Sequence, residues 1–202
     1  MTPAEVAAHS QRPRIDGERE QQIFLATLTV LAEVGYDNLT LDAVATAAHA
    51  SKATLYRRWN GKLLLVIDAL KSMKAPTFVP DTGSLREDLL ATYCSAGGVT
   101  DHASVDTFAS VLTAITRDPD FAEVFRTEIH EPKMIAARAI YRRAQERGEI
   151  ADDVDIDLFV HSLTGIVLHR HYVLGGFPDH DLVARVLDQI ILPALHHTPS
   201  PH

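Results

Sequence analysis

Helical periodicity runs through almost the whole chain and is the feature that most narrows its possible folds. Apolar residues recur three or four positions apart, as in residues 18–34, where they form one face of an amphipathic helix. The strict alternation of apolar and polar residues that marks a half-buried strand is nearly absent. The sequence therefore predicts an all-α fold of about nine helices, at residues 18–34, at 41–48, from Ser51, and at 62–74, 85–96, 103–116, 119–147, 155–174 and 179–196.

Glycine and proline residues mark the expected ends of these helices. Gly35 follows the first helix, at a position where a left-handed residue commonly ends a helix. Pro132 falls inside the 119–147 helix and is expected to kink or split it. Residues 75–84, APTFVPDTGS, are the clearest boundary signal. We therefore expect a flexible N-terminal arm at residues 1–16, an N-terminal helical domain at 17–75 and a larger C-terminal helical domain at 76–202.

Charge is distributed unevenly along the chain, whose formal net charge at pH 7 is −8. Residues 1–75 carry nine basic and eight acidic side chains, whereas residues 76–202 carry ten and nineteen. Within the first part, SKATLYRRWNGK at residues 51–62 holds four basic residues and no acidic one. A local basic patch can bind nucleic acid even in an acidic protein. The alternative is a chance cluster on a solvated surface.

Several functional classes lack their sequence signatures here. The single cysteine, Cys94, excludes an intrachain disulfide framework and a multi-cysteine metal site. No apolar run approaches the roughly 20 residues of a membrane-spanning helix, and the first residues lack the apolar core of a secretory signal. His169 and His171 point to different faces of a helix, and no catalytic triad, phosphate-binding loop or dinucleotide fingerprint occurs. We expect a soluble cytoplasmic protein without membrane contact, enzymatic activity, metal or cofactor.

Two short predicted helices, separated by three residues, match the spacing of a helix-turn-helix. Thr40 is the expected N-cap of the first helix and Ser51 that of the second. In such a unit the second helix lies in the major groove of DNA, while the first crosses the phosphate backbone. The spacing thus predicts double-stranded DNA as a partner of the basic stretch at residues 51–62.

The residues of this second helix divide by face. Leu55 and Trp59 lie four positions apart and are predicted to pack against the preceding helices as core. Ala53 and Thr54 are short enough to bring the helix close to base edges, and Arg57 is the candidate for a bidentate guanine contact or, failing that, a phosphate contact. The predicted DNA-binding residues are Thr40, Ser51, Lys52, Ala53, Thr54, Tyr56, Arg57, Arg58 and Lys62.

The stretch TLDAVATAAHASKATLYRRWNGK, preceded by FLATLTVLAEVGYDNL, resembles the DNA-binding domain of the TetR family of bacterial transcriptional regulators. Gly35-Tyr36, the TLY at residues 54–56, Trp59 and Lys62 carry the family's motif. RAQERGEI and GGFPD, farther along the chain, resemble the C-terminal domain of one subgroup more loosely. The resemblance covers most of residues 17–196 and implies DNA binding by residues 17–75 and effector binding and dimerisation by residues 76–202.

Two residues depart from the family pattern. His49 stands where the family usually has glycine in the bend, so a positive φ is expected there. It could carry mild strain and reach a phosphate, or it could be a tolerated turn residue. Asp42 stands where some relatives have a basic residue that contacts DNA, and a carboxylate cannot bind phosphate.

Arg12 and Arg14, in the N-terminal arm, could enter the adjacent minor groove, unless the arm is a disordered tail.

For the C-terminal domain, the resemblance implies a homodimer in which the last two helices pair with their copies across a two-fold axis. The predicted interface is Leu163, Val167, Val183, Val186, Leu187, Ile190 and Ile191, although part of each apolar stripe must form an intrachain core. The resemblance also implies a pocket for an unidentified small-molecule effector. Its candidate lining residues, each of which could instead be simple core, are Leu90, Tyr93, Cys94, Phe108, Val111, Phe121, Phe125, Ile129 and Tyr141.

The predicted function is that of a DNA-binding transcriptional repressor that binds a palindromic operator as a homodimer and is released by an effector. The sequence does not separate a repressor from an activator. The alternative is an all-α small-molecule-binding protein or enzyme without a DNA-binding role. That alternative predicts convergent titratable groups in a pocket and no salt-dependent affinity for DNA.

Overall fold

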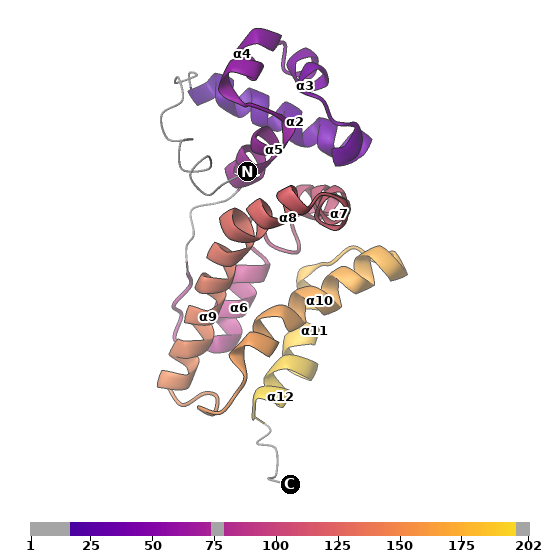
Figure 1. Cartoon of the computed structure of the whole chain (residues 1–202). Helices are drawn as coiled ribbons and strands as arrows, with labels where there is room; N and C mark the ends of the chain where they lie inside the picture. Colours follow the sequence, from indigo (N-terminus) through magenta and orange to yellow (C-terminus); the bar gives the residue numbers. More distant parts are fainter. Residues whose placement is uncertain (1–16, 74–78, 197–202) are drawn as a thin grey trace. The chain divides into compact units, whose positions relative to one another are not determined.

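The computed structural model of the chain describes residues 17–73 and 79–196. Every regular element in these two ranges is helical, so the predicted all-α fold is confirmed (Figure 1). The helices form two compact units: unit 1 is Met1–Lys74 with Asp106–His130, and unit 2 is Ala75–Val105 with Glu131–His202. Residues 106–130 therefore pack with the N-terminal helices, and the functional boundary near residue 76 remains a prediction. The N-terminal arm, with Arg12 and Arg14, lies outside the described residues.

Unit 1 is built around the first helix of the described chain. Its core contains Ile23, Leu31, Val44 and Leu65, all of which are fully buried. The elements of unit 1 are α2 (Gly17–Asn38), α3 (Leu41–Ala47), α4 (Lys52–Arg58), α5 (Lys62–Ser72), most of α7 (His102–Arg117), α8 (Pro119–Phe125) and the π-helical segment η2 (Arg126–His130).

Unit 2 has a separate core, in which Leu89, Tyr141, Leu163 and Leu187 are fully buried. Aspartate N-caps begin two of its helices, because Asp155 and Asp179 each accept a hydrogen bond from a backbone N–H three residues later. Besides the first residues of α7, unit 2 contains α6 (Leu85–Tyr93), α9 (Glu131–Glu146), α10 (Ile156–Leu174), α11 (His180–Val186), the π-helical segment η3 (Leu187–Ile191) and α12 (Leu192–His196).

Two proline residues account for the two π-helical segments. Within an α-helix, proline leaves a carbonyl four residues earlier without its donor and its ring clashes with that carbonyl. Pro132 and Pro193 each lie two residues beyond a π segment, and in each case the carbonyl at i−4 belongs to that segment. The chain therefore widens locally instead of breaking, and the predicted interruption at Pro132 takes this form. With η2 following α8 directly and η3 following α11 directly, the helical segments of the described residues group into nine stretches.

Gly35 interrupts α2 as the sequence predicts. Its φ of 73° and ψ of 167° lie outside the helical region, and three further residues complete the element. One of them, Tyr36, is buried with its ring 4.6 Å from that of Phe121 in α8. Burial and the nearby Asp118 carboxylate together raise the pKa of Tyr36 well above its usual value, so the phenol stays neutral.

Candidate nucleic-acid interface

A short turn joins α3 to α4 (Figure 1). This turn is a Schellman motif centred on His49. The Ala50 N–H donates to the Ala45 carbonyl at 2.8 Å, and the His49 N–H donates to the Thr46 carbonyl at 3.1 Å. His49 has a φ of 50°, which confirms the positive φ expected at this position. The motif satisfies the last carbonyls of α3 and turns the chain directly into α4. It does so at some cost, since histidine lacks the conformational freedom of glycine.

A side chain of α2 holds this turn from outside. Arg19 donates from Nη2 to the His49 carbonyl at 2.5 Å and from Nη1 to Gln22 at 2.7 Å. At the other end of α3, the Ala43 N–H donates to Thr40 Oγ1 at 3.1 Å, so Thr40 is the N-cap that the sequence predicts. Both ends of α3 are therefore fixed by specific hydrogen bonds.

The inner face of α4 packs into the core of unit 1, as the spacing of Leu55 and Trp59 predicts. Both side chains are fully buried. The Trp59 ring meets Phe24 of α2 edge to face, with centroids 5.9 Å apart, and its indole N–H donates to Asp68 of α5 at 2.8 Å. A buried indole needs such a partner. These contacts fix the orientation of α4 around its own axis.

The outer face of α4 consists of Lys52, Ala53, Tyr56 and Arg57, all of which are exposed. Tyr56 is 57% exposed, which is high for an aromatic side chain. Thr54 is half-buried at the edge of this face. The spacing i, i+1, i+4, i+5 places the four on one side of the helix, opposite Leu55.

Ser51 stands at the N-cap position of α4, but its side chain makes no capping hydrogen bond. This corrects the prediction that its hydroxyl caps the helix. The Thr54 and Leu55 N–H groups instead bond to the Ser51 main-chain carbonyl, at 3.0 and 3.3 Å. The Ser51 hydroxyl is consequently exposed next to the outer face of α4.

Lys52 forms an ion pair that the sequence did not reveal. Its ammonium lies 2.5 Å from Oδ2 of Asp42 in the first turn of α3, and the side chains are 62% and 45% exposed. The hydrogen bond to Asp42, together with its negative charge, raises the pKa of Lys52. The sequence-based prediction left Asp42 out of the DNA-binding residues because a carboxylate cannot bind phosphate. It did not include the ion pair that Asp42 forms with Lys52.

Two of the predicted DNA-binding residues, both cations, bind other parts of unit 1. Arg58 Nη2 lies 2.6 Å from Oε1 of Glu20 in α2, and its guanidinium lies 5.7 Å from the centre of the Trp59 ring. Lys62 donates from Nζ to the carbonyls of Tyr36 and Asp37, at 2.8 and 3.0 Å. These bonds close the C-terminal end of α2. Phosphate contacts by Arg58 and Lys62 remain predictions, and within the described residues both side chains already have structural partners.

The candidate effector residues separate into two groups. One group belongs to the core of unit 2 or packs against it: Leu90, Tyr93, Cys94 and Tyr141. The other group belongs to the core of unit 1 or packs against that core: Phe108, Val111, Phe121, Phe125 and Ile129. Burial raises the pKa of Tyr93 to about 12 and also raises that of Cys94, as expected for core positions. A single pocket lined by all nine residues stays a prediction.

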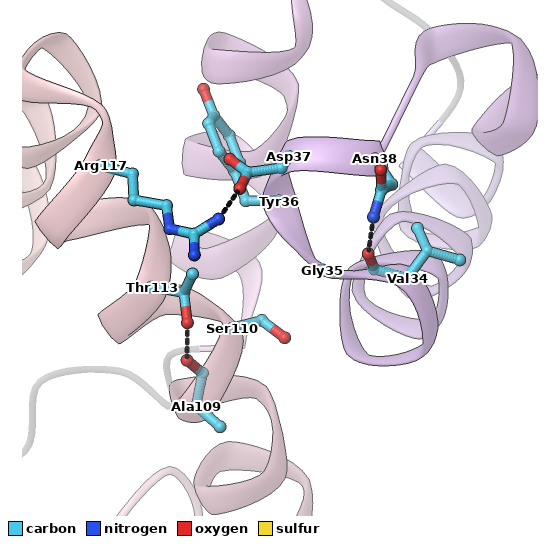
Figure 2. A pocket seen from close by; sticks show the side chains of 9 residues that line it. All are labelled: Val34, Gly35, Tyr36, Asp37, Asn38, Ala109, Ser110, Thr113 and Arg117. Atoms are coloured by element: carbon cyan, nitrogen blue, oxygen red, sulfur yellow. Dashed lines mark hydrogen bonds and ion pairs between the residues drawn. The ribbon is translucent and has the colours of Figure 1, made fainter.

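Unit 1 contains a hollow of about 330 Å³ that none of these candidates lines (Figure 2). It lies between Val34–Asn38 at the end of α2 and one face of α7. An ion pair of 2.7 Å between Arg117 Nη1 and Oδ2 of Asp37 crosses its rim (Figure 2). Its two charged groups therefore satisfy each other.

The predicted dimer residues are mostly internal. Leu163, Val167, Val183, Val186, Leu187 and Ile191 are buried in the core of unit 2, and of the seven predicted residues Ile190 is the exposed one, at 48%. The assignment of the six buried residues to a surface between two copies is therefore wrong. The apolar period of α10 and of the last helix is satisfied within one chain. Large apolar side chains are instead exposed elsewhere on these elements, at Leu158, Tyr172, Val173 and Leu174.

Residues 17–73 and 79–196 contain no group of three or more histidine, cysteine or acidic side chains arranged to hold a metal ion. Among the helices of the same ranges, none combines the length and apolar character needed to cross a bilayer.

Comparison with known proteins yields two family matches. Residues 23–69 match "Bacterial regulatory proteins, tetR family", and residues 79–190 match "Tetracyclin repressor-like, C-terminal domain". An HTH-type transcriptional regulator of Mycobacterium tuberculosis is 36% identical over 181 residues, which is 88% of each chain. The DNA-binding transcriptional repressor TetR of Mycobacteroides abscessus is 34% identical over 179 residues, covering 87% of this chain and 94% of that protein. The crystal structure of the TetR family transcription regulator SCO0332 is 28% identical with a TM-score of 0.62, covering 86% and 97%.

Proposed function

This chain belongs to the TetR family of DNA-binding transcriptional regulators, which are not enzymes, and we propose a specific role for it within that family. The proposed role is that of a repressor that binds a palindromic operator as a homodimer. A small-molecule effector would then release it from the operator. The observation that carries the proposal is the outer face of α4, which is exposed while Leu55 and Trp59 anchor the opposite side.

On this face, Arg57 supplies the group best suited to read a base. Its guanidinium is exposed and forms no ion pair within the described residues, so it can donate two parallel hydrogen bonds to guanine O6 and N7. Ala53 has a side chain short enough for close approach to the groove floor, and Thr54 can place its methyl group against a thymine methyl. Tyr56 is exposed one turn beyond Lys52 and can donate its phenolic O–H to a phosphate oxygen.

Dimerisation is supported by the exposed apolar side chains of unit 2. Leu158, Val173 and Leu174 of α10 and Ile190 of η3 are each about half exposed or more. Exposed apolar groups on neighbouring helices are typical of a surface that another molecule covers. A second copy related by a two-fold axis would cover them and would present two α4 helices to successive major grooves.

The relative from Mycobacteroides abscessus, to which this chain is 34% identical, is a DNA-binding transcriptional repressor, which supports repression as the role of this chain. For an effector to release the operator, it must bind more tightly to a conformation in which the two α4 helices no longer match the DNA. The aromatic and aliphatic residues predicted from the sequence remain the candidates for the effector site.

A salt titration tests DNA binding. A labelled duplex pool of random sequence would first be enriched for binders by the wild-type protein, and the affinity for the enriched duplex then measured by fluorescence anisotropy between 50 and 300 mM salt. We expect log K to fall linearly with log salt concentration, because each phosphate contact releases counterions. Failure to enrich any duplex, together with an affinity that does not depend on salt, would contradict the proposal.

A further inference from the structure

We infer that Asp42 lowers the affinity of this protein for DNA by holding the Lys52 ammonium away from the phosphates. The inference rests on the proposed DNA-binding function of α4 and adds a residue that sets how strongly that helix is held. The sequence alone places Lys52 among the DNA-binding residues and leaves Asp42 out of them. The structure joins the two in one ion pair.

The fold of the helix-turn-helix creates this pair. Asp42 lies in the first turn of α3, and Lys52, ten residues later, is the first residue of α4. The Schellman motif at His49 turns the chain sharply enough to bring these two helix beginnings together. Lys52 Nζ and Asp42 Oδ2 are 2.5 Å apart, well within reach of a charge-assisted hydrogen bond.

Helix electrostatics favour the pair from both sides. A carboxylate in the first turn of a helix is stabilised by the positive end of the helix dipole, whereas a cation at the same position is destabilised. Lys52 therefore occupies an unfavourable position in α4, and Asp42 compensates for it. The second carboxylate oxygen of Asp42, Oδ1, is shielded from solvent and has no hydrogen-bond partner among the described residues. Loss of Lys52 would leave this partly desolvated carboxylate without a cation.

Bound DNA would compete directly with Asp42 for Lys52. An exposed ion pair is weak and screened by salt, so the competition is close enough to be shifted by one substitution. The negative charge of Asp42 also repels any phosphate that approaches the start of α4. With Asp42 present we expect Lys52 to contribute no counterion release, and without it one full phosphate contact.

A cycle of four proteins tests this inference: wild type, Asp42→Asn, Lys52→Ala and the double variant. Each would be titrated at several salt concentrations with the enriched duplex and with a random 30-base-pair duplex. We expect Asp42→Asn to bind both duplexes more tightly, roughly two- to fivefold at low salt, and to steepen the salt slope by about 0.9. Lys52→Ala should change the slope little in the wild-type background and should remove the added slope in the Asp42→Asn background.

Asp37→Asn is the matched control. Asp37 has the same side-chain exposure as Asp42, 45%, and is also paired to a basic residue, but its partner Arg117 lies on α7. The Asp37→Asn substitution removes the same charge from unit 1 as Asp42→Asn does. An equal steepening of the salt slope by Asp37→Asn would therefore show a general charge effect and overturn the inference. Asparagine is close in size to aspartate, and a thermal melt of each variant confirms that the fold is retained.

Two further results would overturn the inference. An unchanged slope and affinity for Asp42→Asn would show that Lys52 reaches phosphate regardless of Asp42. A loss of affinity confined to the enriched duplex would show that Asp42 accepts a hydrogen bond from a base such as cytosine. Both results presuppose salt-dependent binding by the wild type, so they are distinct from failure of the proposed function, in which the wild type itself does not bind.

Discussion

The recognition helix α4 and the C-terminal pair of α10 and α11–η3–α12 carry equally regular patterns in the sequence, yet the structure assigns those patterns differently. In α4, the residues predicted to be core, Leu55 and Trp59, are core, and most of the residues predicted to face outward are exposed. In the C-terminal pair, six of the seven residues predicted to lie between two copies are buried in the interior of one copy.

The difference shows what periodicity can and cannot determine. A repeat of three or four residues identifies which side chains share a face of a helix. It does not identify what covers that face, because the desolvation that drives burial is the same against a partner chain and against the same chain. In α4 the outer face is polar and charged, so only one face could be internal. In the C-terminal pair both faces carry apolar residues, and the sequence offered no means to choose.

The largest effect is expected from a charge placed inside the C-terminal stripe. Leu187 is fully buried, so Leu187→Asp should destabilise the protein by roughly 3–5 kcal/mol, since an unpaired carboxylate would be desolvated. Chemical denaturation followed by circular dichroism measures this loss. The matched variant Ile190→Asp, at an exposed position, should keep its stability and yield monomers in light scattering. A folded monomer from Leu187→Asp would show instead that the stripe faces a partner.

A smaller effect is expected on the outer face of α4. Arg57→Ala should reduce affinity for the enriched duplex by about 1–3 kcal/mol and relax the preference at particular base pairs, if the guanidinium reads a base. Its stability should not change, because the side chain is exposed. The measurement is a titration against single-base variants of the duplex. A uniform loss over all duplexes would assign Arg57 to phosphate.

A substitution at Lys62 tests whether its ammonium stabilises the fold or binds DNA. Lys62→Met keeps the apolar stem but removes the two hydrogen bonds to α2 and the contact with the Tyr36 ring, whose centre lies 4.5 Å from Nζ. We expect a loss of about 1 kcal/mol in the free energy of unfolding, and an unchanged salt slope for DNA binding would then remove Lys62 from the predicted DNA-binding residues. Unchanged stability with a slope lower by about one would return Lys62 to the phosphate-binding set.

The smallest effect concerns the bend between α3 and α4. His49 has a φ of 50°, so His49→Gly should raise the stability by about 0.5–1 kcal/mol, partly offset by the greater freedom of glycine in the unfolded chain. His49→Ala is the control and should give no gain, because alanine keeps the steric conflict. The shift of the denaturation midpoint measures both. A less stable glycine variant would mean that the histidine side chain makes a compensating contact.

The sequence predicted the all-α fold, the helix-turn-helix and the cap at Thr40, because each depends on local chemistry. The positive φ at His49 was predicted from the resemblance to the family, which usually has glycine there. The sequence could not predict that Arg58 pairs with Glu20, or that Lys62 closes the end of α2, because those partners lie 38 and 25–26 positions away in the chain. Basic residues in a motif therefore need their partners in the folded chain before they can be assigned to DNA.

The outer face of α4 is the surface that we propose to meet DNA. Thiol labelling tests this proposal directly in a Cys94→Ala background, with a single cysteine introduced either at Ala53 on α4 or, as a control, at Ala194 on α12, both exposed. The labelling rate would be measured with and without saturating enriched duplex. We predict strong protection of the cysteine at position 53 and none at position 194. Equal labelling of position 53 with and without bound duplex would contradict the assignment of DNA binding to this face.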